Sequence, residues 1–249
     1  MISLGGNKVK QNFKIRPGEN NLENNSFYKY RIFKLNNSKN LFFPKNKEFT
    51  LFLFKVAKPT YIIIKNKKYK VSNGDSFNIK NYEKVIIHTK KSIFFSINST
   101  KKSLKNEIVK TRYNNHYKVN KPWGYELWVT GNKRSYAFKE IKIKKGFQTS
   151  LQFHRKKRET NFLFQGKARL IYKKKPNVKN MLIKTCDLGK KDMKNYAVIN
   201  VTPNIVHRIK ALSDIKLFET STPELDDVVR IMDDSNRKDG KILSEHKKK

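Results

Sequence analysis

The short apolar runs of this chain constrain its fold most strongly. They are rich in β-branched and aromatic residues and are separated by turn residues such as Lys58-Pro59 and Asn73-Gly74. No long stretch of the sequence has the 3.6-residue period of an amphipathic helix. Regularly spaced strands without helices are typical of antiparallel sandwiches and barrels, so the sequence predicts an all-β fold.

The apolar runs form two series, which indicates two β-units. The first series is residues 51–56, 61–64, 84–87 and 92–97. The second series is residues 138–143, 150–153, 160–164, 168–172, 197–201, 207–211 and 216–220. Few apolar residues lie between the two series. We therefore expect a first unit over residues 1–100, a linker over 101–120, a second unit over 121–237 and a basic tail over 238–249.

The charge is strongly positive, with 57 Lys and Arg against 20 Asp and Glu and a net charge of +37. Only ten of the basic residues are Arg, and the lysines are spread along the whole chain. Nucleic-acid readers more often gather Arg and aromatic residues on one face. The pattern therefore predicts a solvated surface and no specific nucleic-acid partner. A milder alternative is that the field attracts small anions such as sugar phosphates.

The sequence has few cysteines and lacks a membrane-spanning run and a signal peptide, and these features indicate its cellular compartment. Cys186 is the only cysteine, which excludes an intrachain disulfide and a cysteine-based zinc site. No apolar run approaches membrane-spanning length, and the first residues lack the apolar core of a signal peptide. We expect a cytoplasmic protein without a membrane partner.

Residues 146–166 contain the candidate chemistry. Gln152 and His154 are two apart, so on a strand their side chains point to the same side. The residues after His154 predict a turn, from which Glu159 would return opposite the His, and His207 begins a later strand. Such a mixture of nitrogen and oxygen donors suits zinc, iron, manganese, nickel or cobalt. An isolated His is more often an ordinary polar residue, so spacing alone leaves both readings open.

This pattern resembles the motifs of the cupin superfamily. Five residues resemble the first cupin motif in their order and spacing, namely Gly146, Gln152, His154, Glu159 and Gly166. Gln152 stands where most cupins have a His. Residues 203–207 resemble the second motif. Residues 121–126, 150–154, 226–231 and 233–237 are similar to the C-terminal domain of type II mannose-6-phosphate isomerases.

The resemblance implies a jelly-roll-like cupin barrel that interconverts phosphorylated sugars. The expected activity is metal-dependent aldose–ketose isomerisation of mannose 6-phosphate for polysaccharide or sugar-nucleotide precursors. It implies one divalent transition metal, most simply zinc, held by Gln152, His154, Glu159 and His207; a homodimer is compatible with it. Residues 71–79 resemble the Gly-Asp turn of cupins, so we expect a bicupin whose N-terminal half is degenerate.

Two further residues are candidates for the reaction. Lys157 is the candidate base, if burial or its neighbours Lys156 and Arg158 lower its pKa; the alternative is a solvated turn lysine. Arg208, beside His207, is the candidate phosphate ligand, because guanidinium groups bind phosphate in a fork; the alternative is a surface role.

The chain departs from the type II pattern in ways that leave a second function open. Lys156 and Thr160 stand where the family has His, and the turn before His207 is one residue shorter. These differences favour a non-catalytic metal-containing cupin that binds a sugar or nucleotide sugar. The first half has no Gly-rich phosphate loop, which argues against guanylyl transfer. Dioxygenation is a weaker alternative, because its usual ligands are His residues.

Overall fold

The chain folds almost entirely into β-strands, which confirms the predicted all-β class. The computed structural model describes residues 2–4, 7–82, 84–130, 134–174, 184–188 and 196–246. Over these ranges the only helices are two short 3-10 turns, η1 (Tyr113–Asn115) and η2 (Leu243–His246). Neither is long or apolar enough to cross a lipid bilayer.

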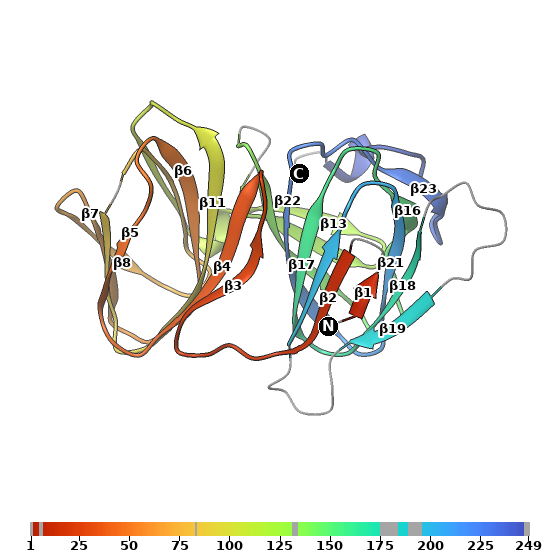
Figure 1. Cartoon of the computed structure of the whole chain (residues 1–249), viewed down its shortest axis with the longest axis horizontal. Helices are drawn as coiled ribbons and strands as arrows, with labels where there is room; N and C mark the ends of the chain where they lie inside the picture. The colour runs from red at the N-terminus through yellow and green to blue at the C-terminus, as the bar shows by residue number, and fades with distance from the viewer. Residues whose placement is uncertain are drawn as a thin grey trace. The chain divides into compact units, whose positions relative to one another are not determined.

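The chain divides into two compact units (Figure 1). The C-terminal unit combines Met1–Lys14 with Tyr117–Lys249, and the N-terminal unit is Ile15–His116. These boundaries differ from the predicted ones for two reasons. The first residues pair with a strand of the C-terminal half, and most of the predicted linker over residues 101–120 forms strands that pair within one unit or the other.

The C-terminal unit contains two antiparallel sheets. The larger sheet has the order β1 (Ile2–Leu4), β2 (Asn7–Phe13), β20 (Tyr196–Val201), β17 (Glu159–Gln165), β22 (Ile215–Ser221), β15 (Ala137–Ile143), β14 (Gly124–Trp128) and β13 (Tyr117–Lys121). The smaller sheet has the order β19 (Lys184–Leu188), β18 (Ala168–Lys174), β21 (Ile205–Ala211), β16 (Leu151–Phe153) and β23 (Val229–Met232).

The N-terminal unit also contains two sheets, which enclose a core of buried aliphatic and Phe side chains. The larger sheet has the order β12 (Glu107–Thr111), β9 (Ser76–Lys80), β6 (Lys47–Val56), β11 (Ser92–Lys102), β4 (Tyr28–Leu35) and β3 (Gly18–Asn24). The smaller sheet has the order β5 (Lys39–Phe42), β10 (Lys84–His88), β7 (Thr60–Ile64) and β8 (Lys67–Val71).

The interior of the C-terminal unit is part apolar and part charged. Along β15, Lys139, Ile141 and Ile143 point to the same side because they are two residues apart, and all three are buried. Leu217 and Glu219 follow the same pattern on β22. The aliphatic members join the hydrophobic core, whereas the charged ones gather at the other end of the strands, where each needs a partner.

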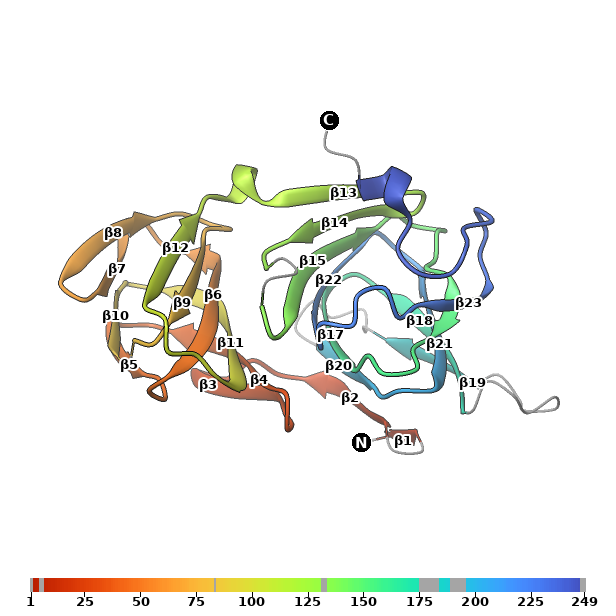
Figure 2. The same ribbon diagram turned by 90° about the horizontal axis from the view of Figure 1, so that it is seen from above.

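The predicted basic tail over residues 238–249 is partly folded. The backbone N–H of Gly240 donates to the carbonyl of Val228 at 2.8 Å, and η2 lies beside β13 (Figure 2). The Tyr117 hydroxyl donates to the carbonyl of His246 at 2.7 Å. This segment departs from the prediction because it carries an acidic residue, Glu245, which pairs with the C-terminal unit at Lys121. Residues 247–249 lie outside the described ranges.

The two motif glycines differ in what surrounds them, which gives a stability prediction. Gly146 and Gly166 have the same φ of +85°, but a Cβ on Gly166 would lie 2.2 Å from the carbonyl oxygen of Asp214, whereas one on Gly146 would meet nothing within 4 Å. Gly146→Ala is expected to cost about 1–2 kcal/mol of unfolding free energy through its left-handed backbone alone. Gly166→Ala should cost at least about 1 kcal/mol more, because backbone must also shift. Urea unfolding of both variants tests this, and equal losses would contradict it.

Candidate metal centre

A cavity inside the C-terminal unit brings both of its sheets to one site. Its volume is about 110 Å³, several times the roughly 10–15 Å³ that one water needs, so a small ligand fits. The larger sheet supplies Glu159 and Glu219, and the smaller sheet supplies Gln152 and His207. The segment before η2 adds Lys241 to the lining.

Three of the predicted ligands meet in this cavity. His154 follows β16, Glu159 begins β17 and His207 lies on β21, and all three are buried. Glu159 lies between the two rings: its Oε1 is 3.1 Å from Nε2 of His207 and its Oε2 is 3.5 Å from Nε2 of His154. One donor atom from each residue lies within 4.8 Å of the others, a spacing that one metal ion can bridge.

The orientation of both imidazoles fits a metal. Nδ1 of His154 is hydrogen-bonded to the carbonyl of Asp227, and Nδ1–H of His207 donates to the carbonyl of Ile205 at 3.0 Å. Such contacts leave the lone pair on Nε2 and fix the ring, as in many zinc sites. Nε2 of His154 is buried and has no hydrogen-bond partner among the described residues. A transition metal would satisfy it, and the nitrogen–oxygen donor set suits such an ion.

Electrostatics favour an ionised Glu159 and a neutral His154. Burial opposes the charge of Glu159, but Lys157 and His207 outweigh it and hold the pKa of this carboxyl well below its ordinary value. Burial, with the nearby Lys157, lowers the pKa of His154. Burial also acts against the charge of His207, but Glu159 raises the pKa of that ring overall. The carboxylate is therefore ready to bind a cation, whereas a metal would have to displace a proton from His207.

Gln152 lies beside the three residues. Its backbone is directly opposite His207 in the pairing of β16 with β21, and its side chain lines the cavity. Its Oε1 accepts a hydrogen bond from the Ser150 hydroxyl at 2.6 Å. An amide oxygen has two acceptor positions, so one remains. Its role as a fourth ligand stays a prediction.

Lys157 is buried and is neither the solvated lysine nor the low-pKa base considered above. Its Nζ donates to Oε2 of Glu159 at 2.7 Å and to Oε1 of Glu219 at 2.9 Å. Burial alone would lower the pKa of Lys157, but the two carboxylates outweigh it and raise the pKa well above its ordinary value. The condition set for Lys157 to act as base, a lowered pKa, is therefore not met, because the partners of this ammonium are carboxylates and not Lys156 and Arg158.

A row of alternating charges continues from Lys157 across the larger sheet. Nζ of Lys139 lies 3.7 Å from Oε1 of Glu219 and 3.6 Å from Oε2 of Glu126. The indole N–H of Trp128 donates to the same Glu126 oxygen at 3.1 Å. Burial opposes the charge of Glu126, but Lys139 and other cations outweigh it and lower the pKa of this carboxyl. Each buried charge is thus balanced by its neighbours.

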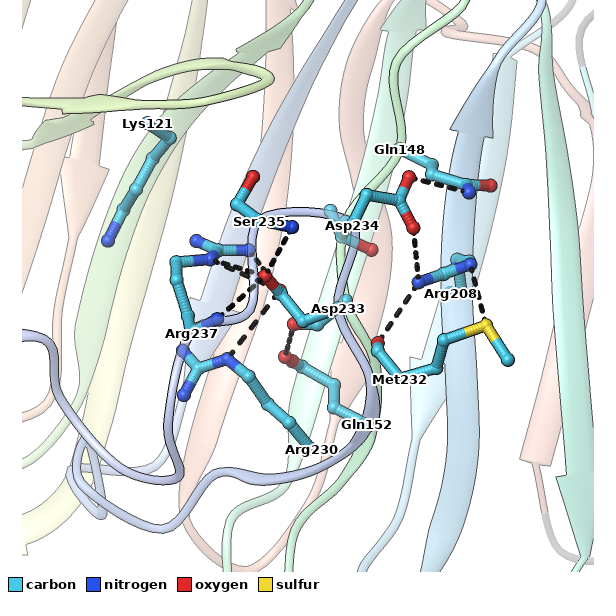
Figure 3. A network of polar contacts seen from close by, with 12 residues as sticks. Lys121, Gln148, Gln152, Arg208, Arg230, Met232, Asp233, Asp234, Ser235 and Arg237 are labelled. Carbon is cyan, nitrogen blue, oxygen red and sulfur yellow. Dashed lines mark hydrogen bonds and ion pairs between the residues drawn. The ribbon is translucent and has the colours of Figure 1, made fainter.

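Arg208 does not line the cavity, so its predicted role as a phosphate ligand has no support at this site. It follows His207 on β21, and successive side chains of a strand point to opposite faces. Its guanidinium donates to the carbonyl of Met232 at 3.0 Å and to Oδ1 of Asp234 at 3.1 Å (Figure 3). It therefore anchors the turn after β23.

Arg230 and Arg237 line the cavity instead. Both point toward Asp233 in Figure 3, and the Arg237 guanidinium donates to Oδ2 of Asp233 at 2.7 Å. Sequence reasoning missed these two residues as well as Glu126, Lys139, Asn161 and Glu219. The quoted family-like segments contain three of the six, Glu126, Arg230 and Arg237, and so carried a usable signal. No comparable local signal marks Lys139, Asn161 or Glu219.

Asp227 supports both the turn and the first His ligand. Its Oδ1 accepts the backbone N–H of Arg155 at 3.0 Å, and its Oδ2 accepts those of Lys156 at 2.5 Å and Lys157 at 2.8 Å. Partial burial raises the pKa of Asp227, but these donors outweigh it and lower the pKa overall. Its backbone carbonyl holds Nδ1 of His154. One residue thus orients a candidate ligand and the turn that follows it.

Asp227→Asn is therefore expected to weaken metal binding about 10–100-fold, the usual effect of removing a group that supports a ligand. The side-chain NH2 of the new Asn would face the backbone N–H groups of residues 155–157, and two donors facing each other would displace this turn. Competition against a chromophoric chelator measures the affinity. Asp226→Asn is the matched control, because Asp226 is the exposed neighbour. Equal affinities for the two variants would contradict the prediction.

Residues 108–233, just over half of the chain, match the family described as mannose-6-phosphate isomerase C-terminal. No curated protein matches the sequence.

Solved structures match the fold of both units. An IolB-like protein from Salmonella typhimurium LT2 is similar with a TM-score of 0.66 at 10% identity, over 86% of this chain and 90% of that one. Oxalate decarboxylase from Lactobacillus farciminis has a TM-score of 0.61 at 10% identity, over 92% of this chain and 88% of that one. Oxalate decarboxylase from Bacillus subtilis, described with Mn(II) centres, has a TM-score of 0.61 at 10% identity, over 90% of this chain and 77% of that one. The expected cupin fold is confirmed.

Proposed function

The chain belongs to the mannose-6-phosphate isomerase C-terminal family, and on this premise we propose that its cavity is a metal-dependent site for aldose–ketose isomerisation of a phosphorylated sugar. The observation that carries the proposal is the buried group of His154, Glu159 and His207, whose donor atoms converge inside a cavity large enough for a ligand. Buried charges and a buried unpartnered imidazole nitrogen are costly to maintain, so they favour a functional role for the site.

The residues around the centre suit this chemistry. When bound, a divalent metal, most simply zinc, supplies a Lewis acid that polarises a sugar carbonyl and stabilises negative charge on its oxygen. His154, Glu159 and His207 would hold it, with Gln152 as the proposed fourth ligand. Asn161 fixes the carboxylate, since its amide donates to Oε1 of Glu159 at 3.0 Å.

The balance of charge favours an anionic substrate. Three glutamates line the cavity against six cationic side chains, and a divalent metal would add to the positive side. The six cations are Lys121, Lys139, Lys157, Arg230, Arg237 and Lys241. A phosphorylated sugar has both a carbonyl for the metal and a dianion for this field. We therefore favour a phosphosugar over a neutral sugar.

The test is hydrogen exchange at the reacting carbon. The metal-loaded protein should exchange the C2 proton of mannose 6-phosphate with solvent deuterium, followed by NMR, and should act much less on free mannose. Exchange detects proton abstraction itself and does not depend on which product accumulates. Absence of exchange from both mannose 6-phosphate and fructose 6-phosphate, with metal bound, would overturn the isomerase proposal.

The alternative is a cupin that binds a sugar or nucleotide sugar without turnover. One observation favours it: Lys157, the residue expected to act as base, is held as an ammonium between two carboxylates. The exchange experiment separates the two functions, because a binding protein would retain affinity for the phosphosugar, measured by calorimetry, without exchanging its proton.

A further inference from the structure

Glu219 is a cavity carboxylate that the candidate metal centre does not use. It lies on β22, between β15 and β17, and is buried. Its inward direction follows from the strand, because Leu217, two residues earlier, also lines the cavity. Burying a carboxylate is costly, so a carboxylate in a ligand-sized cavity is expected to have either a structural or a chemical role.

Lys157 ties Glu219 to the metal-binding residues. One ammonium donates to Oε1 of Glu219 at 2.9 Å and to Oε2 of Glu159 at 2.7 Å. In the pairing of β17 with β22, Glu219 is also directly opposite Asn161, whose amide holds Glu159. Glu219 therefore lies one side chain away from the candidate ligand Glu159, and both carboxylates line the same cavity.

The hydrogen bonding of Glu219 leaves one oxygen available. Among the described residues, the hydrogen bond from Lys157 and the ion pair with Lys139 both involve Oε1. Oε2 is not among the buried atoms that lack a partner, which agrees with its facing the cavity. An acceptor that is held through one oxygen and open at the other is suited to proton transfer.

The other cavity groups are poorer candidates for a base. The rings of His154 and His207 converge with Glu159 on the metal position. The third imidazole of the lining, His246, packs instead against Tyr117 and Trp128. Lys157 uses its N–H groups to donate to two carboxylates, and an ammonium has no lone pair to accept a proton. Glu126 is joined to this group through Lys139, which lies between it and Glu219, so Glu126 is one side chain farther from the candidate ligands. Glu219 remains.

We propose that Glu219 is the catalytic base that moves a proton between the two adjacent carbons of the sugar, an inference that rests on the proposed isomerase function. The C2–H bond breaks and an O–H bond forms on Oε2, while the electron pair moves into the C1–C2 bond and the aldehyde oxygen takes the negative charge. The carboxyl then returns the proton to C1. The proton of the C2 hydroxyl moves to the C1 oxygen, which completes the ketose without any other reactant.

The experiment compares Glu219→Gln with the wild type, using the full chain loaded with zinc. Gln keeps the shape but removes the base, so deuterium exchange at C2 of mannose 6-phosphate should fall at least about 100-fold, within the usual range for general-base catalysis. Metal content and calorimetric binding of mannose 6-phosphate should remain. Glu140→Gln is the matched control: Glu140 is a buried glutamate of β15 that pairs with Lys216 and does not line the cavity.

A second variant separates catalysis from structure. Glu219→Ala leaves space for a small carboxylate, so added formate should restore part of the exchange if the carboxylate acts chemically. Two results would overturn this inference and leave the proposed function standing. The first is exchange that persists in Glu219→Gln. The second is loss of metal from Glu219→Gln together with a failure of formate to rescue Glu219→Ala. No exchange by the wild-type protein would overturn the proposed function and this inference with it.

Discussion

Glu159→Gln is expected to abolish stoichiometric metal binding, from about one ion per chain to almost none. The substitution removes the carboxylate that lies between the two imidazoles and leaves Lys157 beside the position of the cation. The loss of affinity should exceed the 10–100-fold typical of residues that only support a ligand. Elemental analysis after dialysis against trace metal measures it. His207→Ala should behave alike.

The control for the metal experiment is His88→Ala, since His88 lies on β10 of the N-terminal unit and is exposed. A chelator should also destabilise the wild type, by about 2.7 kcal/mol if free metal had been at 100 times its dissociation constant. Chelation should have no such effect on Glu159→Gln. If Glu159→Gln retained the metal and His88→Ala lost it, the metal centre would lie in the N-terminal unit and our assignment would be wrong.

Lys157→Met is expected to destabilise the metal-free protein by about 3–5 kcal/mol, because it leaves Glu159 and Glu219 buried without their shared cation. Metal should reduce the loss, since a cation would again compensate Glu159. Urea unfolding with and without chelator measures both values. Lys156→Met, at the exposed neighbour, should change the stability by less than about 0.5 kcal/mol.

A further variant tests the cause of this instability. Adding Glu219→Gln to Lys157→Met should recover part of the lost stability, because one unpaired buried charge is removed. If Lys157→Met were as stable as Lys156→Met, the ion pairs would not be the groups that stabilise this end of the unit.

Local patterns were sufficient for the all-β class and for the shared face of two candidate ligands, but not for strands outside the two apolar series, such as β3, β4 and β13. Alternation within a strand is a property of the backbone, so the two-residue spacing of Gln152 and His154 predicted a shared face, as observed. The same rule, applied to His207 and Arg208, would have placed the arginine on the opposite face; adjacency in sequence misled the assignment of a phosphate ligand.

The roles of Lys157 and Glu219 could not be predicted in this way. Their contact joins residues 62 positions apart, the turn before β17 and the strand β22, which become neighbours only once the sheet has formed. The pKa of Lys157 depends on which charges surround it, and local sequence suggested Lys156 and Arg158, whereas the sheet supplied two carboxylates. The domain boundaries were wrong for the same reason, because β2 pairs with β20 from the far end of the chain.

The sequence by itself determined the fold class, the spacing of the candidate ligands and the family, because strand alternation and motif spacing depend on near neighbours. Only the tertiary structure decided which charged residues share the cavity, which of them compensate one another and that residues after β23 line it. The physical reason is that Coulomb interactions and burial depend on distances in space, and strand order sets those distances independently of separation along the chain.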